Sequence, residues 1–163
     1  AIAVLLFEKP QREFHYCAIE ILMKELKGKY QVQDIELITK LITTHSWWDS
    51  VDTISKYILG QYLTEFSQSI EQITTKFSKS ENMWLNRTAV LFQLGYKAKT
   101  NFTLLQKICL EHQNSSEFFI QKAIGWSLRE YAKTNPLDVE KFINSASLKP
   151  LSKKEALKNL RNA

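Results

Sequence analysis

Residues 116–133 read SEFFIQKAIGWSLREYAK, and this stretch is the best guide to the fold of the whole chain. Its apolar side chains recur every three or four residues, which is the spacing of one face of an α-helix. The positions concerned are Phe119, Ile120, Ala123, Ile124 and Leu128. Ser116 stands where a helix N-cap is expected. The stretch therefore predicts an amphipathic helix with one buried face.

The same helical spacing extends over most of the sequence. It predicts a helix that begins after Pro10 and is ended by Gly28, and helices at Asp34 to Ile42, Ser46 to about Tyr62 and 64–78. Further helices are predicted to begin at Ser80, near Leu104, at Asn135-Pro136 and at Ser152. Ser46 with Asp49, and Ser152 with Glu155, have the spacing of capping boxes. No stretch has the turn residues of a β-hairpin. With only 4 Gly and 3 Pro, the chain favours long helices and an all-α fold.

The long helices recur at a separation of roughly 35 residues, which is the period of helical-pair repeats. Such pairs stack into an α-solenoid with a concave face. We therefore expect an α-solenoid of antiparallel helix pairs, with an irregular all-α bundle as the alternative.

Composition limits the classes of protein to consider. The 163 residues are 44% hydrophobic and 24% charged, as in a single globular domain. The net charge of +5 is compatible with a polyanionic partner but does not establish one. Cys17 and Cys109 lie in apolar helical patterns and are predicted to be buried, reduced thiols.

The sequence gives no indication of a metal, a cofactor or a membrane partner. Two Cys and three scattered His offer no pair at the spacing of metal ligands. No apolar run reaches the length of a transmembrane helix, and no signal peptide is visible. We expect a cytoplasmic monomer.

Three predicted helices each contain a Trp followed three or four residues later by a charged residue. The sets are Trp48 with Asp52, Trp84 with Arg87, and Trp126 with Arg129 and Lys133. Residues at this spacing share one face of a helix. A carboxylate can stabilise a developing positive charge, a Trp face attracts cations, and an Arg grips phosphate oxygens in a bidentate way. Because Asp49 is assigned to a capping box, Asp52 is the candidate carboxylate.

Each set also has an ordinary explanation. Trp48 would lie at a helix interface with Asp52 in solvent. Arg87 would form a salt bridge to a neighbouring helix. Trp126 would be a core residue beside a solvated basic stripe of Arg129 and Lys133. Repetition of the arrangement on three helices is what favours a shared binding surface.

These segments resemble the AlkD-type DNA alkylation repair proteins, in order and over nearly the whole chain. The matching segments are Pro10–Phe14, Ser46–Asp52, Trp84–Ala89, Lys122–Lys133 and Leu151–Ala156. The Trp-Trp-Asp and Gly-Trp-Ser-Leu-Arg-Glu-Tyr motifs are long enough to be specific. Family members have further N-terminal helices, including an aromatic residue that touches the lesion. This sequence lacks them, so we expect residues 1–163 to be a single HEAT-like domain without those helices.

The resemblance implies HEAT-like repeats with a concave DNA-binding face and a DNA glycosylase of base excision repair. Its substrates would be cationic alkylated purines, such as 3-methyladenine and 7-methylguanine, in duplex DNA. The family's catalytic carboxylate corresponds to Asp52, and its phosphate-contacting arginine to Arg87. Its two tryptophans that embrace the sugar-phosphate correspond to Trp48 and Trp126. Arg129 and Lys133, on the face of Trp126, are expected to join in binding DNA.

Two other functions stay open at this point. A HEAT-like array can be a non-catalytic scaffold that binds protein or DNA through its concave face. A relative could also bind branched or damaged DNA without cutting it. Asp52 favours the enzyme, because a scaffold has no need for a carboxylate flanked by tryptophans.

Overall fold

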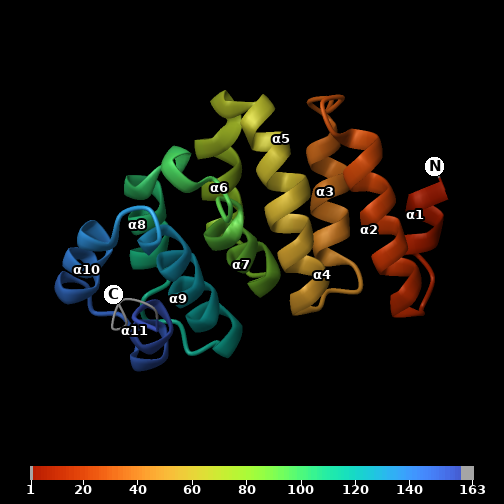
Figure 1. The fold of residues 1–163 in the computed structure, drawn as a ribbon. Helices are drawn as coiled ribbons and strands as arrows, with labels where there is room; N and C mark the ends of the chain where they lie inside the picture. Colours follow the sequence, from red (N-terminus) through yellow and green to blue (C-terminus); the bar gives the residue numbers. More distant parts are fainter. Residues whose placement is uncertain (1, 159–163) are drawn as a thin grey trace. The chain divides into compact units, whose positions relative to one another are not determined.

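The computed structural model describes residues 2–158, which form helices and no strand (Figure 1). The chain divides into two compact units, Ala1–Thr88 and Ala89–Ala163. The first contains α1 (Ile2–Phe7), α2 (Arg12–Leu26), α3 (Asp34–Thr43), α4 (Trp48–Thr53), α5 (Gly60–Glu65), α6 (Ile70–Ser78) and the start of α7 (Met83–Leu91). The second contains the end of α7 and α8 (Phe102–Glu111), α9 (Phe118–Ala132), α10 (Pro136–Ser145) and α11 (Pro150–Ala156). The predicted all-α class is confirmed.

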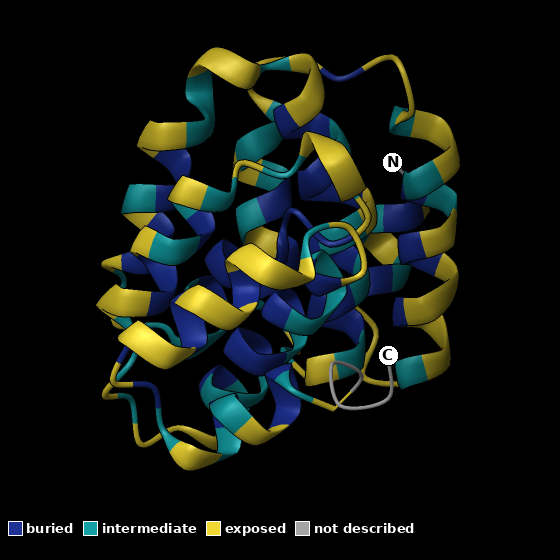
Figure 2. Cartoon of the chain, turned by 60° about the vertical axis from the view of Figure 1, so that its left-hand side comes forward, coloured by how far each residue is buried: buried dark blue, intermediate teal, exposed yellow. Residues whose placement is uncertain are grey.

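The first unit is built around one long helix made of α4, a π-helical segment at Ile54–Leu59, and α5. Both α2 and α3 pack against this helix. In the π-helical segment the hydrogen bonds reach one residue further than in an α-helix, as when the N–H of Gly60 donates to the carbonyl of Ser55. Val51, Ile54 and Leu63 are fully buried along it, so the helix presents one apolar face to the core. Figure 2 shows this alternation of buried and exposed residues along the helices.

The second unit is centred on α9, which packs against α10 and α11. The hydroxyl of Ser152 in α11 donates to the carbonyl of Gln121 in α9 over 3.0 Å. Gly125 faces the same helix, and a methyl group there would overlap the Cβ of Glu155 and lie 2.8 Å from the carbonyl oxygen of Ser152. The missing side chain of Gly125 therefore allows the two backbones to approach this closely.

Gly125→Ala is expected to destabilise the protein by about 1–3 kcal/mol, because backbone atoms of α11 must move to admit the methyl group. This would reverse the usual gain of roughly 1 kcal/mol when Ala replaces Gly inside a helix. Thermal and urea denaturation would measure it, with Lys141→Ala on the exposed side of α10 as a surface control. A Gly125→Ala protein as stable as the wild type would contradict the close approach.

The helix starts show where local patterns fail. The hydroxyl of Ser46 donates to the carbonyl of Ile42 instead of capping, and α4 begins after Trp47 with no side-chain cap. Likewise Ser152 lies inside α11, which begins at Pro150. Both predicted capping boxes are therefore wrong. In contrast, the helix start predicted at Asn135-Pro136 is confirmed, since the side chain of Asn135 caps α10 and accepts from the N–H of Asp138.

The two cysteines differ. Cys109 is buried as predicted, and burial raises the pKa of its thiol to about 12. Cys17 is exposed, which corrects the prediction. The reason is that α2 turns His15, Ala18, Ile19 and Leu22 to the core, and Cys17 lies outside this buried set.

Candidate functional site

The first unit holds a buried ion pair between Asp52 and Arg87. Asp52 lies in the last turn of α4 and is 7% exposed, while Arg87 lies in α7 and is 3% exposed. The Nε of Arg87 donates to Oδ1 of Asp52 over 2.7 Å, and its Nη2 donates to Oδ2 over 2.8 Å. Asp52 is therefore not the solvated carboxylate of the ordinary explanation. Arg87 does bridge to another helix, and its partner is the candidate carboxylate itself.

Neighbouring hydroxyls fix the two helices beside this pair. The hydroxyls of Ser55 and Thr88 lie 2.9 Å apart in the core. Each is also bonded to a carbonyl four residues earlier, Ser55 to that of Val51 and Thr88 to that of Trp84. Because Ser55 follows Asp52 by three residues and Thr88 follows Arg87, this contact holds the ion pair in register.

Three influences act on the charge of Asp52. Burial raises the pKa of its carboxyl above the ordinary value, the hydrogen bonds and charge of Arg87 oppose that rise, and the negative charge of Asp49 adds to it. A buried carboxylate that must stay ionised therefore depends on the groups around it.

Tryptophan rings lie exposed at the start of α4. Trp47 is 42% and Trp48 45% exposed, although large aromatic side chains are usually well buried. The centroids of the Trp47 and Trp84 rings lie 6.3 Å apart. Trp48, four residues before Asp52, can therefore present its ring to a ligand.

A cluster that the sequence did not reveal lies beside Asp52. Asp49 accepts hydrogen bonds from Arg12 and Tyr16 of α2 and from the N–H of Ser50. Burial acts to raise the pKa of the Asp49 carboxyl, but the hydrogen bonds from Tyr16, Ser50 and Arg12 outweigh it and lower the pKa. The spacing of Arg12 and Tyr16 by four residues shows only that they share a face, and nothing in it points to Asp49.

The other predicted site residues lie on α9 in the second unit. Trp126 is half-buried, so it is not a fully enclosed core residue. Arg129 donates from Nη1 to Oε2 of Glu155 over 3.0 Å, and Lys133 pairs with Glu130 at 2.6 Å. Both basic residues thus have acidic partners within this unit.

Glu155 is the acidic centre of a basic surface. Its carboxylate, 6% exposed, also pairs with Lys122 at 2.9 Å and Lys158 at 2.6 Å. Burial acts to raise the pKa of Glu155, but Lys158 and Lys122 outweigh it and bring the pKa down to about 2. Three cations against one anion leave this surface positive.

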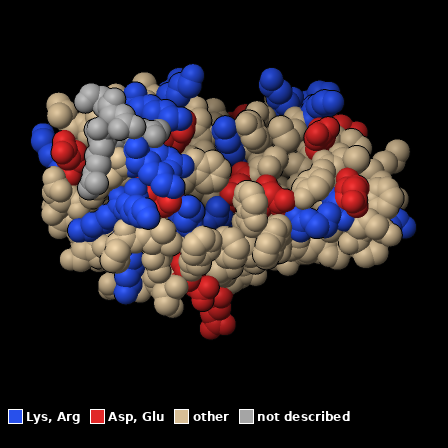
Figure 3. All heavy atoms as spheres, turned by 60° about the horizontal axis from the view of Figure 1, so that its bottom comes forward, with Lys and Arg blue, Asp and Glu red and all other residues tan. Residues whose placement is uncertain are grey.

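The two units also differ in overall charge. Residues 1–88 contain 10 Lys or Arg and 11 Asp or Glu, whereas residues 89–163 contain 12 and 6. The positive surplus of the chain therefore belongs to the second unit. Figure 3 shows Lys and Arg gathered in groups on one face of the protein, with Asp and Glu between them.

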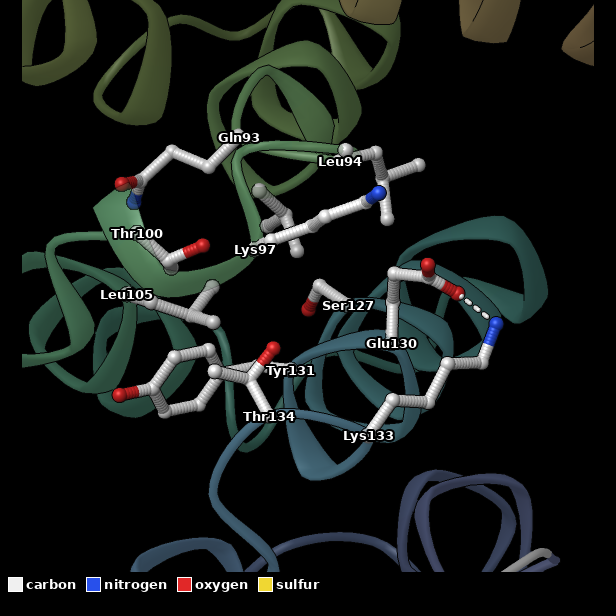
Figure 4. A pocket seen from close by; sticks show the side chains of 12 residues that line it. Gln93, Leu94, Lys97, Thr100, Leu105, Ser127, Glu130, Tyr131, Lys133 and Thr134 are labelled. Atoms are coloured by element: carbon white, nitrogen blue, oxygen red, sulfur yellow. Dashed lines mark hydrogen bonds and ion pairs between the residues drawn. The ribbon is translucent and has the colours of Figure 1, made fainter.

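The second unit contains a cavity of about 250 Å³ between α9 and the loop that follows α7 (Figure 4). Hydroxyls of Thr100, Ser127 and Thr134 line it, over Leu105. The ion pair of Glu130 with Lys133 lies at the edge of the cavity, so the charges of these two side chains neutralise each other.

Two kinds of feature are missing from residues 2–158. No helix in that range is long and apolar enough to cross a membrane. The same range contains no group of three or more His, Cys, Asp and Glu placed to hold a metal ion.

Comparison with known proteins gives a consistent result. The family model described as "DNA alkylation repair enzyme" matches residues 1–160. A solved structure described as "Predicted DNA alkylation repair enzyme from Enterococcus faecalis" is 36% identical, with a TM-score of 0.88. The match covers 99% of this chain and 75% of that one. No curated protein matches this chain.

Proposed function

Because the chain belongs to the DNA alkylation repair enzyme family, we propose that it is a DNA glycosylase. It would excise cationic N-alkylated purines, such as 3-methyladenine and 7-methylguanine, from duplex DNA, acting as a monomer in the cytoplasm. The observation that supports this most is the carboxylate of Asp52, buried and held by two hydrogen bonds one helical turn from the exposed ring of Trp48.

The proposed chemistry needs one carboxylate. Alkylation at a ring nitrogen makes the purine positively charged, so the base leaves neutral and needs no general acid, unlike the leaving group of ordinary glycosides. The sugar left behind resembles an oxocarbenium ion. Ionised Asp52 would stabilise that cation and orient or deprotonate the attacking water. Exclusion of water by the flanking rings would strengthen its field.

The main role of Arg87 would be to orient Asp52 and keep it ionised. A bidentate guanidinium fixes the direction of a carboxylate and favours its ionised form. The contact with a neighbouring phosphate that we also propose for Arg87 would be made alongside this ion pair.

The remaining roles concern binding. We propose that Trp48 and Trp126 pack on the sugar-phosphate of the damaged nucleotide, and that Arg129 and Lys133 add to the attraction for phosphates. The positive surplus of residues 89–163 supports an electrostatic contribution of this kind.

The wild-type protein is expected to release 3-methyladenine and 7-methylguanine from methylated duplex DNA, as measured by chromatography of the freed bases. Unmethylated duplex of the same sequence is the control. Binding should weaken steeply with salt, because phosphate contacts release counterions.

One observation favours a second candidate, a protein that binds alkylated or branched DNA without cutting it. Both oxygens of Asp52 already accept from Arg87, as they would in a purely structural ion pair. Salt-sensitive DNA binding with no released base would establish this alternative and contradict the glycosylase.

A further inference from the structure

Two carboxylates lie one turn apart on α4. Asp49 precedes Asp52 by three residues, so both side chains lie on neighbouring positions of one helix face. Asp52 is buried, and its ionised form is disfavoured both by that burial and by a like charge nearby. Asp49 therefore works against the group on which the proposed chemistry depends, unless its own charge is compensated.

Helix α2 supplies that compensation. Arg12 donates from Nη2 to Oδ1 of Asp49 at 2.5 Å, and the hydroxyl of Tyr16 donates to Oδ2 at 2.7 Å. Arg12 also donates to the hydroxyl oxygen of Tyr16 from Nε at 3.2 Å and from Nη2 at 3.0 Å. The three side chains thus form a closed cluster in which each contacts the other two, and α2 packs directly against α4.

We propose that Arg12 and Tyr16 are positioning residues that keep Asp52 ionised, acting through Asp49. Arg12 neutralises Asp49, and Tyr16 holds the second oxygen of that carboxylate in a fixed direction. The consequence for excision rests on the proposed function, whereas the effect on the charge of Asp52 does not.

The charged groups acting on Asp52 come from three helices. Arg87 of α7 stabilises its ionised form directly, and Asp49 of α4 destabilises it. Arg12 of α2 stabilises the ionised form of Asp49. Loss of Arg12 should therefore raise the pKa of Asp52, and loss of the Asp49 charge should lower it. A cluster that merely joined α2 to α4 would not produce opposite effects from two members of one ion pair.

Arg12→Gln is expected to raise the midpoint of the Asp52 carboxyl titration by about half a pH unit, since partly exposed charges interact through a high effective dielectric. Asp49→Asn should lower that midpoint by a similar amount. The measurement is the ¹³C carboxyl shift of Asp52 in the full chain, followed by NMR from neutral to acidic pH. Lys40→Gln, which breaks the exposed ion pair with Glu8 in the same unit, is the matched control and should leave Asp52 unchanged.

Tyr16→Phe guards against a trivial loss of structure, because it keeps the ring and removes only the hydroxyl. It should also raise the midpoint of the Asp52 carboxyl titration, by less than Arg12→Gln does. Equal midpoints in the wild type, Arg12→Gln and Asp49→Asn would overturn the inference, as would shifts of the same sign in both variants.

The acid limb of the pH profile for excision provides the functional readout. In Arg12→Gln it should move toward higher pH by the amount that NMR gives, with activity restored at higher pH. A wild type that releases no base would overturn the proposed glycosylase, and the NMR titration would still decide this inference by itself.

Discussion

Asp52→Asn is expected to lower excision by roughly a thousandfold or more, while DNA binding stays largely intact. The substitution removes the charge that would stabilise the oxocarbenium-like sugar and leaves the shape of the side chain almost unchanged. Single-turnover release of 7-methylguanine measures the chemical step, and fluorescence anisotropy with the same duplex measures binding.

The ion pair makes a stability control necessary. An Asn at position 52 offers only one acceptor to Arg87 and no negative charge, and removing one member of a buried ion pair costs several kcal/mol. Thermal denaturation must therefore show that Asp52→Asn is folded at the assay temperature. A folded variant with unchanged excision would remove Asp52 from the mechanism.

Arg87→Ala is expected to destabilise the protein by about 3–5 kcal/mol, because it leaves a buried carboxylate without a partner. Part of that cost would be avoided if Asp52 took up a proton, since the loss of Arg87 raises its pKa further. Excision should fall together with stability, because a protonated Asp52 cannot stabilise a cation. Urea denaturation and base release at one temperature measure the two effects.

Arg87→Lys separates charge from geometry. Lysine retains the positive charge but cannot donate two parallel hydrogen bonds, so an intermediate loss of stability is expected. The double variant Arg87→Ala with Asp52→Asn should be much less destabilised than those two single changes added together, because both charges of the ion pair are then removed. If Arg87→Ala lowered only the melting temperature, Arg87 would be a structural ion-pair partner with no part in the chemistry.

Much of the helical structure could be predicted from local spacing, because helix formation depends on residues three and four apart. The helix predicted from Asp34 to Ile42 ends within one residue of α3. Start positions were less predictable. Ser46 and Ser152 fit a cap sequence, but their hydroxyls donate to the carbonyls of Ile42 and Gln121 instead. The spacing of residues along the sequence does not predict these partners. The stacking of helix pairs into a solenoid stays a prediction.

The site was only partly predictable for a related reason. The sequence indicated Asp52 and Arg87 separately, as a carboxylate and a phosphate contact. Their pairing joins residues 35 positions apart, and local periodicity does not tell which helix faces which. The spacing of Ser46 and Asp49 predicts a capping box, whereas in the structure the Asp49 carboxylate accepts hydrogen bonds from Arg12 and Tyr16. The roles of the site residues stay predictions until the variants are measured.

The π-helical segment at Ile54–Leu59 directly follows α4, the helix that carries Asp52. From Ile54 onward the buried side chains of this helix recur every four positions, at Ile54 and Ser55, Ile58 and Leu59, and Tyr62 and Leu63, with Gly60 also buried. A repeat of four is longer than the 3.6 residues of an α-helical turn, and the wider π-helical turn accommodates it. Adding or deleting one residue between Asp52 and Tyr62 would rotate the carboxylate by about 100° relative to the core. One residue inserted into or deleted from this segment would therefore turn Asp52 away from Arg87.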